Sequence, residues 1–320
     1  MIKHITHSKT AVVIKEPELI IAIVLSVLLI IYLGISWYIA HRVMRVPRLP
    51  LGDTPASVGL AYEDVSFHSR IDKLKLKGWY ITGKKAFTVI IVTGMHQHRV
   101  DYSIGVLDFT RELVERGYNV LLFDLRGRGE SQGHGVLLTR FERDIGGAVD
   151  YIKQRGCPAE QIGFIGFSAG AAACVIFASG ECIGALAADT CFADVTDVFI
   201  GKGVSESGLP GWLIGFFGMG MLLVSMVLYG YRKVNPVDRV SAISCPILFI
   251  QGDSDDLVPI NDAHRLKKAS GNPEDEVWIV SGAGHTLSYL TDPDGYIKRV
   301  AAFLGKCERA AARKQAARIF

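Results

Sequence analysis

The chain has 320 residues with a formal net charge of +3; 49% of the residues are apolar and 21% are charged. The charged fraction is ordinary for a folded domain and excludes wholesale disorder. So small a net charge argues against a nucleic-acid-binding surface as the main function. The six cysteines show no Cys-x-x-Cys spacing, so we expect neither a disulfide scaffold nor the usual zinc pattern.

The first expected element is a transmembrane anchor over residues 19–40, preceded by a short polar tail over residues 1–18. The anchor is 22 residues long without a charge, and at about 1.5 Å per residue it would span roughly 33 Å. A cleaved signal peptide is the alternative, but its apolar region would be shorter and no small-x-small site follows Trp37. Residues 41–60 then form a linker. Three basic residues on each side of the span leave its orientation open, so we expect a single-pass cell-membrane protein whose domain lies on an undetermined side.

Residues 61–306 are expected to form one domain in which strands alternate with helices. The predicted strands are residues 62–68, 74–81, 87–93, 118–123, 161–167, 183–188, 247–251 and 277–280. The predicted helices are residues 101–116, 139–154, 169–179, 262–269 and 293–304. This alternation predicts an α/β fold with a mostly parallel sheet and helices on both faces. Ligands bind such a sheet beyond the carboxyl ends of its strands.

Three strand ends carry the residues of a nucleophilic site. Gly166-Phe167-Ser168-Ala169-Gly170 lies between a buried strand and an Ala-rich helix, which is the setting of a nucleophile elbow. Asp255 follows the strand at residues 247–251, and His285 follows the last strand. A serine nucleophile needs a base and the base needs an orienting acid, and the sheet is expected to bring all three together.

Residues 207–231 form a second uncharged stretch, inside a predicted insert over residues 192–233. A single membrane crossing here would separate Ser168 from Asp255 and His285, so we interpret the insert as an apolar lid or an interfacial segment. A buried helix packed on the domain is the alternative. The candidate residues for lid and substrate contact are Trp212, Phe216, Phe217 and Met221. Residues 307–320 are interpreted as a basic C-terminal tail whose Ala-rich sequence favours a helix, and which lies on anionic lipids or frays in solvent.

Taken together, residues 65–304 resemble the α/β-hydrolase superfamily. Residues 92–95 (VTGM) stand where that family has its oxyanion loop, and residues 124–131 (DLRGRGES) resemble its D-x-R-G-x-G-x-S loop. The sequence GFSAG resembles the elbow, residues 252–259 the acid motif that favours Asp255 over its neighbours, and GAGH the histidine motif. Within the superfamily the chain is most similar to anchored bacterial hydrolases related to serine aminopeptidases and to ABHD-type lipid esterases.

The resemblance implies roles for individual residues. Ser168 would be the nucleophile, His285 the general acid and base, and Asp255 the orienting carboxylate, while the backbone N–H groups of Met95 and Ala169 would form the oxyanion hole. One departure is Thr93-Gly94, where the family often has His-Gly. Asp124 is expected to hold its own glycine-rich loop.

We therefore expect a membrane-anchored serine hydrolase that cleaves carboxylic esters of acyl or lipid type through an acyl-enzyme intermediate. A peptidase of the serine-aminopeptidase type is the first alternative, with Asp189 and Asp194 as candidates to bind an amine, although their place just past a strand end favours a role in capping local structure. A non-catalytic binding module on the same fold is the second. The expected partners are a small-molecule or lipid ester substrate and membrane lipid, with no nucleic acid. No cofactor or metal is expected, and the oligomeric state stays open.

Overall fold

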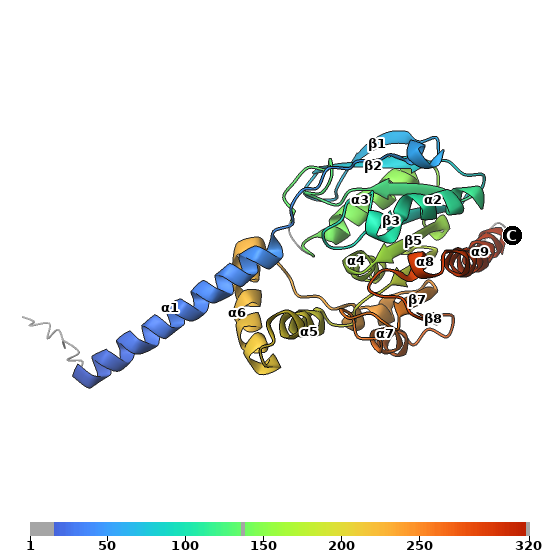
Figure 1. Ribbon diagram of the computed structural model, residues 1–320. Coiled ribbons are helices and arrows are strands. Elements are labelled where there is room, and N and C mark those ends of the chain that lie inside the picture. Colours follow the sequence, from blue (N-terminus) through green and yellow to red (C-terminus); the bar gives the residue numbers. More distant parts are fainter. Residues whose placement is uncertain (1–15, 136–137, 318–320) are drawn as a thin grey trace, which may run out of the picture.

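The computed structural model describes residues 16–135 and 138–317, with side chains up to residue 313. It places an α/β domain beside a long N-terminal helix, α1 (Glu16–Met44), that extends away from it (Figure 1). The helix is longer than the predicted anchor at both ends. The three basic residues before the predicted anchor, Lys3, Lys9 and Lys15, lie outside the described residues.

The domain is built on one eight-stranded sheet with the strand order β1-β2-β4-β3-β5-β6-β7-β8. The strands are β1 (Glu63–His68), β2 (Lys75–Ile81), β3 (Thr88–Val92), β4 (Asn119–Phe123), β5 (Ile162–Phe167), β6 (Ala185–Asp189), β7 (Ile247–Gly252) and β8 (Glu276–Val280). The pairs β1–β2 and β2–β4 are antiparallel, and every other pair is parallel. The sheet is therefore mostly parallel, as the alternation of strands and helices predicts.

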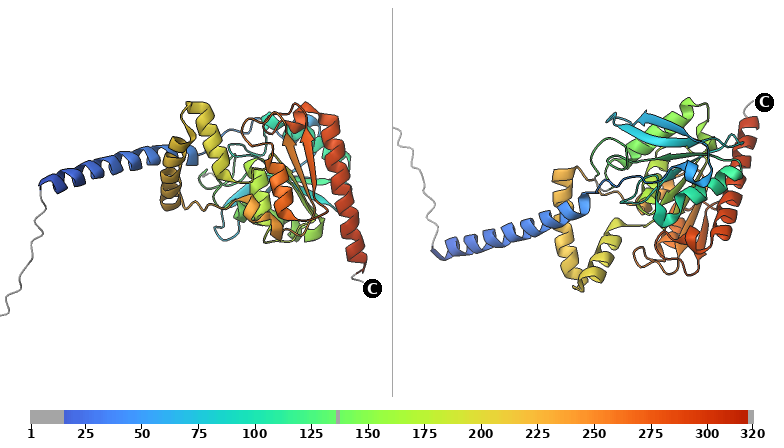
Figure 2. Two further views of the ribbon diagram at one scale, coloured as in Figure 1. Left: turned by 90° about the horizontal axis from the view of Figure 1, so that it is seen from below. Right: turned by 45° about the horizontal axis from the view of Figure 1, so that its top comes forward.

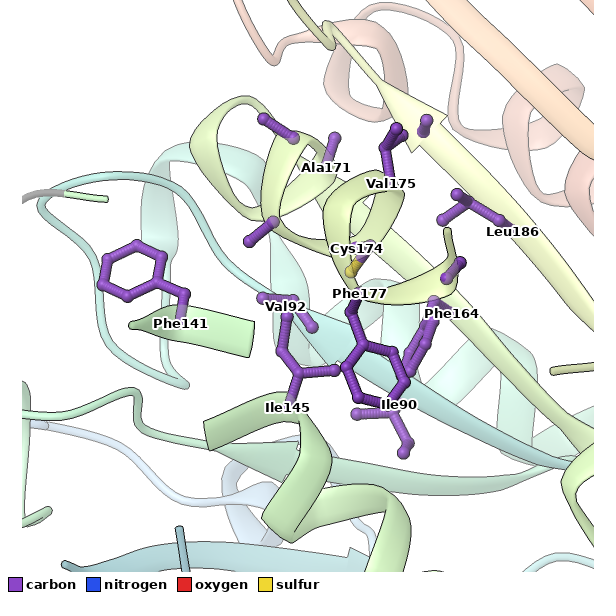
Figure 3. Close-up of a cluster of buried hydrophobic side chains, with 14 of the residues drawn as sticks. Ile90, Val92, Phe141, Ile145, Phe164, Ala171, Cys174, Val175, Phe177 and Leu186 are labelled. Carbon is purple, nitrogen blue, oxygen red and sulfur yellow. The ribbon is translucent and has the colours of Figure 1, made fainter. Parts of the chain in front are cut away.

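Helices cover both faces of this sheet because its central strands are apolar on both sides. One face packs against α3 (Phe141–Gln154), α4 (Ala169–Ala178) and α7 (Asp262–Ser270). Figure 3 shows part of this core, where Ile145 and Phe177 from α3 and α4 meet Ile90 and Phe164 from the sheet. The other face packs against α2 (Val106–Glu115), α8 (Ser288–Thr291) and α9 (Pro293–Ala317).

The C-terminal end of the chain corrects one expectation. Residues 307–317 are not a separate tail, because α9 runs on without a break from the domain to Ala317. Cys307 is only 3% exposed and belongs to the core beneath α9. Gly305 would favour an end to the helix, but the buried Cys307 holds the next turn against the core. The Ala-rich residues that follow favour its continuation.

The predicted insert forms two helices, α5 (Val195–Ser207) and α6 (Gly211–Tyr229), which stand apart from the sheet. Both views in Figure 2 place α6 beside the domain-proximal part of α1, and the two helices are in contact. Only Gly220, Met221 and Ser225 of α6 are buried, which rules out the alternative of a core helix. Helices α1 and α6 are the two that are long and apolar enough to cross a membrane within the described residues.

Candidate active site

Ser168 lies in the sharp turn between β5 and α4, in a strained backbone conformation with φ +51° and ψ −118°. The turn is tight on both sides of the serine. A Cβ on Gly166 would lie 2.6 Å from Ala171 Cα, and one on Gly170 would lie 2.3 Å from the Val92 carbonyl oxygen. Both positions therefore need glycine, which explains the G-x-S-x-G spacing.

Three side chains from different strand ends form one hydrogen-bonded chain. His285 Nε2 lies 2.9 Å from Ser168 Oγ. On the other side of the ring, His285 Nδ1 lies 3.0 Å from Asp255 Oδ2 and 3.2 Å from Oδ1. Ser168 is 7% exposed, and the Asp255 side chain is fully buried. The parallel strands β5, β7 and β8 thus bring together residues that are up to 117 positions apart.

Asp255 is held in place by more than the histidine. Its Oδ1 accepts hydrogen bonds from the backbone N–H groups of Leu257 and Val258, and its Oδ2 accepts one from Gln251. Burial by itself would raise the pKa of Asp255, but His285 and the backbone donors outweigh burial and lower the pKa below its usual value. The carboxylate is therefore charged at neutral pH and faces Nδ1 of the ring.

The two neighbouring aspartates do not take this place. The carboxylate of Asp253 accepts hydrogen bonds from Ser254, Ser281 and the backbone of Gly282, in a turn exposed to solvent. No hydrogen bond joins Asp253 or Asp256 to His285 in the described part of the chain.

The loop after β3 lies against the nucleophile. A Cβ on Gly94 would lie 3.8 Å from Ser168 Cβ. Between residues 16 and 135 and between 138 and 317, no acceptor is found for the backbone N–H of Met95 or of Ala169. Both N–H groups are therefore left without an acceptor in this part of the chain, as the donors of an oxyanion hole must be.

Arg128 fixes this loop and was not singled out from the sequence. Its guanidinium donates to the Met95 carbonyl oxygen from Nη2 at 2.6 Å and from Nε at 3.2 Å. Arg128 stands at a variable position of the D-x-R-G-x-G-x-S pattern, so only its place in a glycine-rich loop near the site could have drawn attention to it. These two hydrogen bonds can fix the position of the loop although it has Thr93 where the family often has histidine.

Asp124 holds the glycine-rich loop in the expected way. Its carboxylate accepts hydrogen bonds from the backbone N–H of Glu130 and from both the backbone and the side chain of Arg99. A Cβ on Gly129 would lie 2.2 Å from Asp124 Oδ2, so the loop closes tightly around the carboxylate.

The two aspartates considered for binding a substrate amine are engaged elsewhere. Asp189 is fully buried and accepts a hydrogen bond from Ser288. Asp194 caps α5 by accepting from the backbone N–H of Thr196, and it also binds Asn235 and Lys233. Asp189 Oδ2 has no hydrogen-bond partner among the described residues, but burial closes it off from a substrate amine.

The candidate lid residues all lie on α6. Phe216 and Phe217 pack on Tyr32 of α1, with ring centroids 4.6 and 5.7 Å from it, while Trp212 is 74% exposed and Met221 is buried. The insert approaches the oxyanion loop through other side chains. Met95 shares one apolar cluster with Met44 of α1, Phe199 of α5, and residues of α6 and its C-terminal end, Leu222, Tyr229 and Tyr231.

Comparisons with known proteins agree with this fold. A family model described as "Serine aminopeptidase, S33" matches residues 83–184. The uncharacterized protein YqkD of Bacillus subtilis is 26% identical over 238 residues, covering 72% of this chain and 75% of that protein. The alpha/beta hydrolase domain-containing protein WAV2 of Arabidopsis thaliana is 26% identical over 304 residues, covering 87% of this chain and 92% of that protein.

Solved structures with a similar fold include two esterases. A structure of the Pyrococcus furiosus esterase Pf2001 superposes with a TM-score of 0.71 and 27% sequence identity, covering 82% of this chain and 98% of that one. A thermophilic esterase from Thermogutta terrifontis, at 20% identity and a TM-score of 0.57, shares the fold. With the sheet topology and the elbow described above, these likenesses identify the chain as a hydrolase of the α/β-hydrolase superfamily.

Proposed function

We propose that the protein is a membrane-anchored serine hydrolase that cleaves carboxylic esters. The observation that carries the proposal is the hydrogen-bonded chain from Ser168 Oγ through His285 to Asp255, with distances of 2.9 and 3.0 Å. This arrangement lets the imidazole take the serine proton while the carboxylate stabilises the imidazolium that forms.

In the proposed reaction Ser168 Oγ attacks the ester carbonyl carbon, and His285 Nε2 takes the hydroxyl proton. The oxyanion that develops accepts hydrogen bonds from the N–H groups of Met95 and Ala169, next to the N-terminus of α4. The alcohol leaves with the proton from His285, and the acyl group stays on Ser168. Water then attacks the acyl-enzyme with His285 as the base, releasing the carboxylic acid and the free serine.

The apolar surface supports acyl or lipid-type substrates and a membrane location. The side chains of α1 are almost all exposed, and so are large apolar side chains of α6 such as Trp212, Met219 and Val227. Soluble proteins rarely expose apolar surface on this scale. We therefore propose that α1 spans the bilayer and that α6 lies at its surface beside the end of the anchor, so that esters with acyl chains reach Ser168 from the membrane side. Monoacylglycerols, lysophospholipids and acyl thioesters fit this description.

Hydrolysis of a series of p-nitrophenyl esters, from acetate to decanoate, tests the proposal on the full chain in uncharged detergent. We expect turnover that rises towards medium chain lengths, is lost in Ser168→Ala, and falls roughly 10³-fold or more in Asp255→Asn. Asp253→Asn is the matched control and should leave kcat within about threefold of the parent.

Other outcomes separate the alternatives. Faster turnover of aminoacyl arylamides than of any ester would favour the peptidase. Equal turnover at all chain lengths would contradict the lipid-type substrate but not the serine hydrolase. No turnover of either class by folded protein would favour a binding module.

A further inference from the structure

A cavity of about 640 Å³ opens between α3, α4 and the C-terminal end of α6. It is separate from the Ser168 hydroxyl, and it runs along the face of α4 that carries Ala172, Ala173 and Ile176. Phe192 and Met226 add further apolar surface. The mechanism proposed above uses none of these side chains.

The charges around this cavity are strongly biased to one sign. Four arginines line it, Arg140, Arg143, Arg232 and Arg239, against the single carboxylate of Glu142. Arg143 is occupied, because it forms ion pairs with Asp72 and Glu142. Within residues 16–135 and 138–313, no ion pair involves Arg140, Arg232 or Arg239, and all three are exposed. Three arginines without a carboxylate partner in the described part of the chain therefore line one hollow, which gives it an excess of positive charge.

The place of the cavity in the molecule indicates where such an anion comes from. Its lining includes Met226, Gly230 and Tyr231, at the end of α6. Tyr231 packs in one cluster with Met44 at the C-terminal end of α1, and His41 Nδ1 lies 3.1 Å from Tyr229 Oη. If α1 spans the bilayer, this end of it lies at the level of the lipid headgroups, and the arginine-lined cavity lies there too.

We propose that this cavity binds the phosphate-bearing headgroup of an anionic membrane lipid. The guanidinium groups of Arg140, Arg232 and Arg239 match the geometry of a phosphate, which accepts paired N–H donors. The apolar wall along α4 and at Met226 suits the glycerol and the first methylenes of the chains. A free phosphate ion would use only the arginines, so the mixed lining favours an amphiphile. The inference rests on the membrane anchoring in the proposed function and not on the catalytic triad.

Binding is tested on the full chain in uncharged detergent, by titration calorimetry with short-chain lipids. Dioctanoyl phosphatidylglycerol is the anionic probe and dioctanoyl phosphatidylcholine the zwitterionic one. We expect the anionic lipid to bind at least tenfold more tightly, and Arg140→Gln/Arg239→Gln to weaken that binding at least tenfold. Glu142→Gln, which removes the opposing carboxylate, should tighten binding severalfold.

Arg309→Gln is the matched control, because Arg309 is exposed and lies on α9, at the end of the molecule away from α1 (Figure 1). It should bind the anionic lipid like the parent. A circular dichroism spectrum and a thermal unfolding midpoint equal to those of the parent establish that each variant is folded.

Two results would overturn the proposal. The first is equal affinity for the two lipids, or no weakening in a folded Arg140→Gln/Arg239→Gln variant. The second is binding of inorganic phosphate as tight as that of the anionic lipid, which would make the cavity a site for a soluble phosphate. Ser168→Ala should bind the lipid like the parent, because the cavity does not use the nucleophile. The two proposals therefore fail separately: a folded parent that binds the lipid but turns over no substrate would contradict the hydrolase proposal alone.

Discussion

Arg128 is a fully buried guanidinium whose hydrogen-bond partners are carbonyl oxygens. It donates to the Met95 and Arg126 carbonyl oxygens and lies over the Phe141 ring, 4.7 Å from its centroid. Burial lowers the pKa of Arg128 to about 10, against the opposing effect of Asp144 and Asp124, so the group stays charged at neutral pH. In the proposed mechanism it is a positioning residue, because it acts on the substrate through the Met95 loop.

Replacing Arg128 should therefore impair the chemical step more than binding. In Arg128→Met the Met95 carbonyl loses its donor and the loop loses its fixed position, so we expect kcat for a medium-chain ester to fall roughly 10- to 100-fold with a smaller change in KM. Arg128→Lys, which keeps one donor, should recover part of the loss. Steady-state kinetics on variants with parental unfolding midpoints measure this. An unchanged kcat in folded Arg128→Met would show that the loop does not depend on the arginine.

Asp189 makes the stability of the fold depend on pH. Burial raises the pKa of Asp189 to about 7, although the nearby Tyr296 and Ser288 hydroxyls and His285 oppose the shift. In the unfolded chain the same group has a pKa of about 3.9. Between these two values the folded state holds a proton that the unfolded state has lost. The contribution of Asp189 to stability is therefore present below about pH 4 and is lost as the pH rises towards 7, by roughly 1.4 kcal/mol per pH unit at most.

Asp189→Asn removes this titration and isolates its effect. The unfolding free energy of the variant minus that of the parent should be more favourable at pH 8 than at pH 5. Thermal or denaturant unfolding of both proteins at the two pH values measures this difference. Ser288→Ala removes a donor that lowers the pKa of Asp189 but leaves the carboxyl group, so it should retain the loss of stability with rising pH and extend it to higher pH. A difference between Asp189→Asn and the parent that does not vary with pH would show that Asp189 is charged in the folded protein.

Many of the candidate site residues can be predicted from the sequence, and those that cannot depend on contacts made only in the folded protein. Ser168, Asp255 and His285 stand at strand ends next to glycines, so the pattern places them before any coordinates are known. Arg128 and Asp189 are different, because their importance depends on which groups surround them after folding. Arg128 needs the Met95 carbonyl, 33 positions away, to have a function at all.

At the level of elements, the contact between α1 and α6 depends on small residues. A Cβ on Gly220 would lie 2.1 Å from Ser36 Oγ and 2.7 Å from Tyr32 Oη. Ser36, Ala40 and Ser225 are buried as well. Small residues let two helices approach closely, which is how helices pack inside membranes. Tyr32 adds a hydrogen bond from its hydroxyl to the Phe216 carbonyl oxygen, at 3.0 Å.

This contact predicts opposite effects for two neighbouring glycines. Gly220→Ala should separate the helices and lower the unfolding free energy by roughly 1–3 kcal/mol. Gly218→Ala, on the same helix with open space around its position, should raise it by up to about 1 kcal/mol, since alanine favours helix. Thermal unfolding in detergent measures both. A stabilising Gly220→Ala would mean that the two helices do not pack as described.

The elements of the domain are predictable because each carries its own signal. Strands β3, β4 and β5 are unbroken apolar runs, and α2 and α3 have one apolar face. The apolar α6 carries no such directional signal, and its length and composition fit a span, a lid or a core helix equally. The position of α6 depends on its contact with α1, in which Tyr32 meets Phe216, 184 positions away in the chain. No local sequence pattern reveals a contact between such distant residues. The helical character of residues 308–317 follows from their composition, but their continuity with the last helix of the domain does not, because it depends on the core contacts of Cys307.

At the scale of the whole molecule, the two long apolar helices, α1 and α6, lie on one side of the domain. In Figures 1 and 2, α1, α5 and α6 lie together, while α9 lies on the far side. The cluster that joins Met44 of α1 to Met95 in the loop after β3 connects this side to the candidate active site. In the proposed function, the anchor therefore holds the site at the membrane surface, and the arginine-lined cavity lies at the same level.

The central claim is that Ser168 is an activated nucleophile, and labelling with a fluorophosphonate probe tests it most directly. The full chain in uncharged detergent should be labelled, and labelling should be absent in Ser168→Ala and strongly reduced in His285→Ala. Ser57→Ala, at an exposed serine whose hydroxyl binds the Thr54 carbonyl, should be labelled like the parent. Folded parent protein that resists labelling, or a Ser168→Ala variant that is labelled like the parent, would contradict the account.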